Sequence, residues 1–209
     1  MLDLHPAAFP REQGERLVRD TYKRDFRERY EAIRHGDSWK LERRQHFEEQ
    51  GSASRDALSR GDWAEALRLI EARRADLLAS ALDDERRDSR FHRVRVVERP
   101  LTPYMQWELH SLRQRAEYGE RIRTIGAGEV AESEGDGLLP EVVVLGGHTL
   151  YEVLYTESGA SCGAVRYTDP EIVGIWESYI KELYRAGEDV QSYFAREVAH
   201  LPPPTINAE

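Results

Sequence analysis

Residues 91–104 read Phe-His-Arg-Val-Arg-Val-Val-Glu-Arg-Pro-Leu-Thr-Pro-Tyr, and this segment sets the predicted architecture of the chain. The valine-rich residues 91–98 favour a β-strand. Thr102 and Pro103 then supply a helix N-cap and a first-turn proline, and apolar residues follow at helical spacing. Residues 121–125 read as a second short strand. A helix that joins two nearby strands predicts a right-handed parallel βαβ crossover.

The same stretch continues to Thr168 with the alternating apolar residues that are typical of an antiparallel meander. Residues 142–145 and 150–155 are predicted to form a hairpin, because Gly146-Gly147 between them is a strong two-residue turn signal. Residues 162–167 are expected to add a further strand. With the crossover, these segments predict a mixed sheet of about five strands.

The remainder of the chain is predicted to be mostly helical. Apolar residues recur at helical spacing in residues 10–35, 39–47 and 62–82, as in amphipathic helices. Residues 126–140 read as a loop. Asp169-Pro170 is a helix start, so two further helices are expected after the sheet.

The predicted fold class is therefore α/β, with a helical N-terminal part followed by the mixed sheet and its flanking helices. Residues 83–90 carry charge and no apolar side chain, which favours a boundary there. We divide the chain into a helical N-terminal region (1–88), an α/β domain (89–200) and a flexible tail (201–209) that begins near three consecutive prolines.

Composition excludes several functions. The 209 residues carry 30 basic and 39 acidic side chains, a net charge of −9, which argues against direct nucleic-acid binding and against attraction to anionic membranes. No apolar run approaches the roughly 20 residues that span a bilayer, and residues 1–6 do not resemble a signal peptide. We therefore expect a cytoplasmic protein. Cys162 is the single cysteine, so no intramolecular disulfide can form.

Motifs for common cofactors are absent from the sequence. Residues 126–137 hold four glycines but neither the Gly-Lys-Ser/Thr of a phosphate loop nor the third glycine of a dinucleotide-binding turn. His46, His92 and His110 have no histidine or cysteine at metal-ligand spacing. We expect neither a cofactor nor a metal.

A candidate ligand site lies around the predicted crossover. Arg95 and the neighbouring strand's Arg123 could converge with Tyr104 and Glu108, which are one helical turn apart, and with Glu120. Two arginines beside a tyrosine would suit a carboxylate or phosphate near the strand ends, where open α/β sheets bind ligands. The alternative is a buried ion-pair network that ties the helix to the sheet.

Aromatic residues of the N-terminal region offer a candidate partner face. Trp39, Phe47 and Trp63 fall in segments predicted to be helical. If they are exposed together, they would form an apolar surface for another protein. The alternative is that each anchors the core.

Three segments resemble a known family. Residues 39–43 (Trp-Lys-Leu-Glu-Arg), 93–104 and 118–123 (Tyr-Gly-Glu-Arg-Ile-Arg) are similar to motifs of an actinobacterial protein family of unknown function. The resemblance covers residues 39–185. It implies a regulatory accessory protein, because genes of that family commonly lie beside those of helix-turn-helix regulators and small acidic partner proteins. Gly147-His148 stands where many relatives have an acidic pair.

The expected strand order also resembles one half of a phospholipase-D-like fold. That chemistry requires a lysine two residues after a histidine, and His148 is followed there by Leu150. The motif is absent, so architecture alone would not imply the activity.

Two functions from different classes remain. The first is a non-catalytic regulatory or accessory protein that binds a partner regulator, such as a helix-turn-helix protein, or a small anionic ligand. The second is a small cytoplasmic enzyme of a biosynthetic pathway that acts on a phosphate- or carboxylate-bearing substrate with Glu108, Tyr104 and the arginines.

Overall fold

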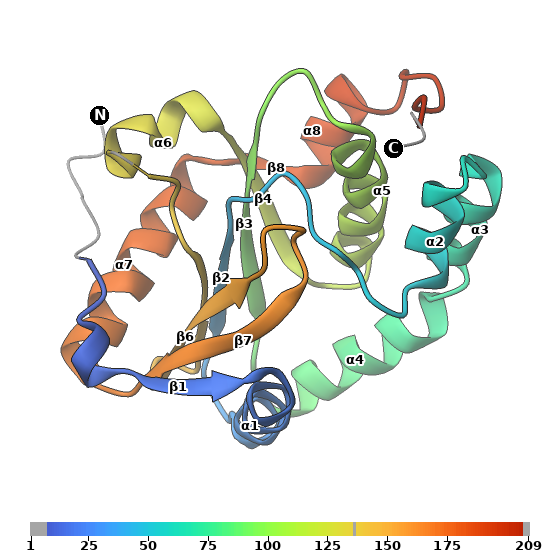
Figure 1. Ribbon diagram of the computed structural model, residues 1–209. Helices are drawn as coiled ribbons and strands as arrows, with labels where there is room; N and C mark the ends of the chain where they lie inside the picture. Colours follow the sequence, from blue (N-terminus) through green and yellow to red (C-terminus); the bar gives the residue numbers. More distant parts are fainter. Residues whose placement is uncertain (1–7, 136, 207–209) are drawn as a thin grey trace.

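One mixed sheet with helices on both faces forms the body of the protein (Figure 1). The structure is a computed structural model that describes residues 8–135 and 137–206. The strand order is β1-β7-β6-β5-β2-β3-β4-β8. The strands are β1 (Glu15–Val18), β2 (Ser38–Glu42), β3 (Phe91–Val97), β4 (Arg121–Gly126), β5 (Glu141–Leu145), β6 (Thr149–Tyr155), β7 (Ser161–Tyr167) and β8 (Glu188–Asp189).

The predicted crossover forms the part of this sheet between β2 and the edge strand β8. β3 and β4 pair in parallel and are joined by α5 (Pro103–Glu117). The Thr102 hydroxyl accepts a hydrogen bond from the Met105 amide at 3.1 Å, and Pro103 occupies the first turn. The N-cap and proline signals therefore predicted this helix start correctly.

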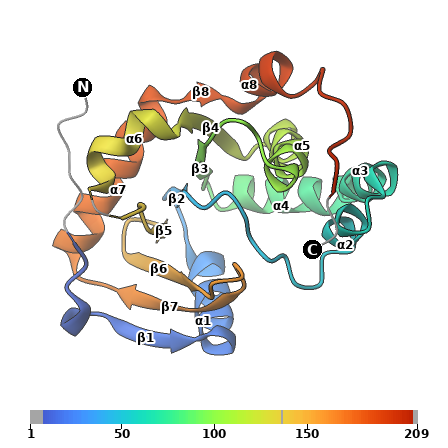
Figure 2. The same cartoon turned by 45° about the horizontal axis from the view of Figure 1, so that its top comes forward.

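Helices cover the two faces of the sheet unequally. The apolar side of α7 (Pro170–Ala186) packs with α6 (Ala127–Glu134) on the face that carries Val94 and Val142. The remaining helices cover the opposite face, as Figure 2 shows for α1, α4 and α5. They are α1 (Arg19–Ala32), α2 (Ala53–Ser59), α3 (Trp63–Glu71), α4 (Arg74–Arg86), α5 and α8 (Val190–Glu197), and a 3-10 helix, η1 (Arg11–Gln13), precedes β1.

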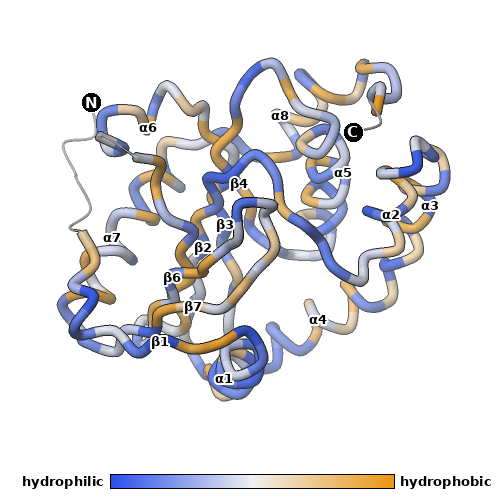
Figure 3. The backbone as a smooth tube through the Cα atoms, viewed as in Figure 1, coloured by the Kyte–Doolittle hydropathy of each residue, from blue (hydrophilic) through white to orange (hydrophobic). Residues whose placement is uncertain are grey.

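Hydropathy follows this layering. In Figure 3 the hydrophobic residues gather along the strands, whereas α1 is mostly hydrophilic because it covers the edge of the sheet with only one side. Among the described residues, no helix is long and apolar enough to cross a membrane.

The α/β class was predicted correctly, but the strand count and the helical N-terminal part were not. The described residues form eight strands rather than about five. Two of them, β1 and β2, precede residue 88, so the sheet spans both of the regions defined from sequence. Residues 126–140, predicted to be loop, contain α6.

The largest error concerns residues 39–47. β2 lies between β3 and β5 in the middle of the sheet instead of forming a helix. Trp39 and Leu41 face the α7 side, whereas Lys40 and Glu42 face the arginines of β3. This is a two-residue period, but it lasts too briefly to be distinguished from a helical pattern without its pairing partners.

The C-terminal segment lies against α5 where it is described. The Gln106 side chain donates a hydrogen bond to the Pro202 carbonyl at 2.8 Å, and Ile206 packs against the core between α5 and α2. The last three residues of the predicted flexible tail, 207–209, lie outside the described residues.

Gly146-Gly147 was correctly predicted to turn between β5 and β6, with φ values of 56° and 71°. The position of Gly163 was not anticipated. It has a φ of 145°, and a Cβ atom there would lie 2.2 Å from the Leu17 carbonyl oxygen of β1.

We predict that Gly163→Ala lowers the free energy of unfolding by about 1–3 kcal/mol, because it combines backbone strain with a clash against β1. Gly128→Ala in α6 is the matched control, since nothing lies within 4 Å of its added Cβ; alanine there should stabilise the helix by about 0.5–1 kcal/mol. Urea denaturation measures both. Equal changes in the free energy of unfolding for the two variants would contradict the proposed clash between an alanine at position 163 and β1.

Candidate functional site

Three of the five predicted ligand-site residues come together beneath α5. Arg95 of β3 donates from Nε to Glu108 Oε2 at 2.8 Å. The Tyr104 hydroxyl lies 3.3 Å from Glu108 Oε1 and 3.1 Å from Glu49 Oε1. Three of the side chains that the sequence suggested could converge are thus in contact, and their role in ligand binding stays a prediction.

Arg95 is wholly internal. It is 0% exposed, and its remaining N–H groups point to the carbonyls of Glu42 and Val96 at 3.2 and 3.0 Å and to the Met105 sulfur. Its guanidinium also lies 5.6 Å from the centre of the Phe47 ring. These contacts fit the ion-pair alternative, because the donors of Arg95 are used within the core.

Glu120 and Arg123 lie apart from this trio. Glu120 accepts from Arg93 at 2.7 Å, and Arg93 also donates to Glu42 at 2.7 Å. Arg123 points to the α7 side of the sheet, where its Nη1 lies 3.1 Å from the Gly187 carbonyl. We call the connected set the buried charge network; it consists of Glu42, Arg93, Arg95, Glu108 and Glu120.

The carboxylates of this network ionise differently. Burial opposes the ionisation of Glu42, but Arg93, Lys40 and Arg95 together outweigh it and lower its pKa. For Glu108, burial outweighs the attraction of Arg95 and raises the pKa. The network therefore favours charged Glu42 and a Glu108 that accepts a proton easily.

We predict that Arg95→Met lowers the free energy of unfolding by about 3–5 kcal/mol, because removing one partner leaves buried charge uncompensated. Glu108→Gln should cost only about 1 kcal/mol, since a neutral amide can still accept from Arg95 and the negative charge of Glu42 still compensates the Arg95 guanidinium. Urea denaturation of the two variants measures this difference. Similar losses in the free energy of unfolding for both would argue against the proposed difference between losing the buried guanidinium and neutralising Glu108.

Glu141, at the start of β5, is a fourth buried carboxyl beside the network. Its Oε1 accepts the backbone N–H groups of Arg43 and Arg44 at 2.9 and 2.7 Å. Among the described residues its buried Oε2 has no hydrogen-bond partner. Burial first, and then the negative charge of Glu42, raise the pKa of Glu141 to about 7.

This shift makes stability depend on pH. The folded protein holds the Glu141 proton up to about pH 7, whereas the unfolded chain releases it near the ordinary value of 4.5. The stabilisation that the Glu141 proton provides is complete below pH 4.5 and is lost as the pH rises to about 7. Relative to Glu141→Gln, the free energy of unfolding of the wild type should fall by on the order of 3 kcal/mol across that window. Parallel pH slopes in urea denaturation would contradict this prediction.

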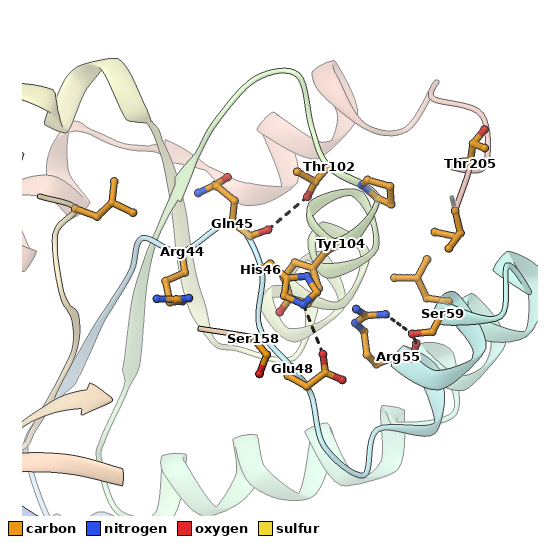
Figure 4. A pocket seen from close by; sticks show the side chains of 14 residues that line it. Arg44, Gln45, His46, Glu48, Arg55, Ser59, Thr102, Tyr104, Ser158 and Thr205 are labelled. Carbon is orange, nitrogen blue, oxygen red and sulfur yellow. Dashed lines mark hydrogen bonds and ion pairs between the residues drawn. The ribbon is translucent and has the colours of Figure 1, made fainter. Parts of the chain in front are cut away.

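A cleft of about 910 Å³ opens where the parallel strands β2 and β3 end; we call it the carboxyl-end cleft. It lies between the chain that follows β2, the start of α5, α2 and the C-terminal segment (Figure 4). Of the five predicted site residues, only Tyr104 lines it. Its walls are Arg44, Gln45, His46, Glu48, Arg55, Leu58, Ser59, Thr102, Pro103, Tyr104, Leu138, Ser158, Thr205 and Ile206.

Two arginines of this cleft have no acidic partner among the residues that the structure describes. Arg44 and Arg55 lie on opposite sides of His46 in Figure 4. The Arg44 guanidinium lies 5.5 Å from the centre of the Tyr155 ring, and that of Arg55 lies 5.7 Å from the centre of the Tyr104 ring. Arg55 donates to the Ser59 hydroxyl. In the part of the chain that the structure describes, neither arginine pairs with a carboxylate, and the buried Nε of each has no partner.

The neighbouring Arg43 contrasts with Arg44. Its side chain is 4% exposed and pairs with Glu98 and Glu134. The one ion pair within the walls of the cleft joins His46 and Glu48 at 3.6 Å. The chain after β2 therefore anchors Arg43 in the protein interior and leaves Arg44 to the cleft.

The sequence contained a signal for these arginines that was missed. Residues directly after a parallel strand lie at the sheet edge where α/β proteins bind ligands. Because residues 39–47 were interpreted as helix, Arg44 and His46 were not placed at a strand end. Arg55 is too far along the chain to be connected with them by spacing.

The candidate partner-face residues do not share an exposed surface. Trp39 is buried under α7 and stacks on His92 with ring centres 4.0 Å apart. Phe47 is buried against Tyr155, and Trp63 is half-buried against His110. Trp39 therefore anchors the core on the α7 side of the sheet, whereas Phe47 and Trp63 both pack into the core on the opposite side.

A metal ion requires several ligand side chains arranged around one point. Within residues 8–135 and 137–206, no group of three or more His, Cys, Asp or Glu side chains is arranged to hold an ion.

Comparison with known proteins identifies a family. A family described as "Domain of unknown function (DUF6879)" matches residues 24–195, and no curated protein matches the chain. Among solved structures, TrmBL2, an archaeal chromatin protein whose structure is reported to show a novel mode of DNA binding, is 9% identical with a TM-score of 0.40. The match covers 88% of this chain and 56% of TrmBL2. The chain thus spans little more than half of that protein, and the similarity is too low to establish a common fold.

Proposed function

The chain belongs to the DUF6879 family, and we propose that it is a non-catalytic regulatory or accessory protein that binds a small anionic ligand in the carboxyl-end cleft. The observation that carries this proposal is the pair Arg44 and Arg55, whose guanidinium groups line the cleft without a carboxylate partner among the described residues. Guanidinium groups bind carboxylates and phosphates through paired, charge-assisted hydrogen bonds.

The position of the cleft supports the same ligand class. The N-terminus of the fifteen-residue helix α5 borders it through Thr102, Pro103 and Tyr104. Helix N-termini carry partial positive charge and favour anions. The cleft also lies at the carboxyl ends of parallel strands, where open α/β sheets bind ligands. Three independent features therefore favour an anion.

The buried position of Glu108 favours a non-catalytic role over the enzyme alternative. Glu108, the residue that the alternative requires for proton transfer, is 6% exposed and bound to Arg95. Tyr104 alone would link it to the cleft. The enzyme hypothesis stays a prediction that needs direct access to Glu108.

The regulatory part of the proposal rests on resemblance. The motifs at residues 39–43, 93–104 and 118–123 resemble actinobacterial proteins encoded beside helix-turn-helix regulators. We infer that such a regulator is the protein partner, that the site of action is the cytoplasm, and that the anion modulates the association.

Sulfate binding tests the cleft directly. The full-length protein should gain thermal stability with sulfate beyond that in sodium chloride of equal ionic strength, because a ligand of the folded state stabilises it by mass action. Arg44→Gln and Arg55→Gln should each weaken binding about tenfold, as expected for one lost charge-assisted hydrogen bond.

Arg60→Gln is the matched control, since Arg60 is exposed at the end of α2 and does not line the cleft. It should bind sulfate like the wild type. Equal weakening in all three variants would indicate non-specific attraction, and no stabilisation by sulfate or by inorganic phosphate would overturn the proposal.

A further inference from the structure

Glu141 connects the carboxyl-end cleft to the buried charge network. It is 4% exposed, and its Oε1 holds the amides of Arg43 and Arg44 at 2.9 and 2.7 Å. Arg44 is also one of the two arginines that line the cleft. A single buried carboxyl group is thus hydrogen-bonded to the backbone of an arginine that lines the cleft.

The charges around Glu141 do not balance it. Glu42 on β2 and Arg95 on β3 are its charged neighbours, and Tyr155 on β6 lies beside it. Arg95 already pairs with Glu108, and Glu42 takes Lys40 and Arg93 as partners. Arg95 therefore attracts three buried carboxyl groups at once, those of Glu42, Glu108 and Glu141.

Glu141 is the least compensated of these three groups. Its partners are two amides at Oε1, and Oε2 is buried without a hydrogen bond among the residues described. A carboxylate oxygen without a partner is costly to desolvate, whereas a carboxylic acid in the same place carries no charge. Proton uptake from water at Oε2 removes that cost.

We propose that Glu141 is a positioning residue whose protonation couples anion binding in the carboxyl-end cleft to pH, a regulation that rests on the proposed function of that cleft. When ionised, Glu141 places a negative charge against the Arg44 backbone and lowers the positive potential that an anion meets. When protonated, it keeps Oε1 as an acceptor for the two amides and removes the charge.

Affinity for an anion is therefore higher when Glu141 carries its proton. Burial raises the pKa of Glu141 to about 7, so the change falls in the neutral range. By reciprocity, a bound anion holds the proton on Glu141 more tightly. Binding takes up a proton from solution as the pH approaches neutrality.

Sulfate is the probe, because its charge does not change across the neutral range. Its dissociation constant is measured by calorimetry on the full-length protein at about pH 6 and about pH 8, at constant ionic strength. Imidazole side chains also change charge there, so all measurements use a His46→Gln background. Affinity should fall about fivefold from the lower to the higher pH, a typical coupling between two sites.

Adding Glu141→Gln should abolish this dependence and leave the affinity near its value at the lower pH. Glu152→Gln is the matched control, because Glu152 is also buried but pairs with Arg11 near the N-terminal segment; it should keep the fivefold change. An infrared band of a protonated carboxyl group that titrates near neutrality should be lost in Glu141→Gln and kept in Glu152→Gln.

The outcomes separate the two proposals. Sulfate binding that depends on Arg44 but is equal at both pH values would overturn the coupling and leave the anion site intact. A pH dependence that survives Glu141→Gln, or a missing carboxyl band, would also overturn it. No sulfate binding at either pH would overturn both.

Discussion

The buried ion pair between Arg95 and Glu108 holds the crossover helix on the sheet. It joins β3, which lies between β2 and β4, to α5 at 2.8 Å in the protein interior. Next to it, Arg93 joins Glu42 of β2 to Glu120 at the start of β4. An unpaired buried charge costs several kcal/mol, so the strands and the helix can shift only if several pairs break together.

This constraint sets the geometry of the carboxyl-end cleft. Because Glu108 is fixed, Tyr104 one turn earlier and the N-terminus of α5 are held at the cleft edge. Glu141 fixes the opposite edge through the amides of Arg43 and Arg44. The groups that line the cleft are thus positioned by buried polar contacts instead of by loop packing, which is how preorganised sites keep their geometry.

The network also explains which candidate residues were found. Arg95, Tyr104 and Glu108 follow from one strand, one helix start and a spacing of one turn, so their contact could be predicted. Whether such a cluster faces solvent or the interior depends on what covers it. Here α5, Phe47 and Met105 cover Arg95, and that covering brings together segments that are distant in sequence.

The β3–α5–β4 crossover and the β5–β6 hairpin follow from local sequence signals, because valine runs, Thr102-Pro103 and Gly146-Gly147 act locally. Ser38–Glu42 is a central strand only in the folded protein, since its backbone hydrogen bonds come from β3 and β5. The cleft likewise forms only in the folded protein, because its walls come from segments between Arg44 and Ile206 that are far apart in sequence. Such long-range contacts leave no periodic pattern in a single sequence, and the physical reason is that their stabilising energy arises only when separate segments pack together.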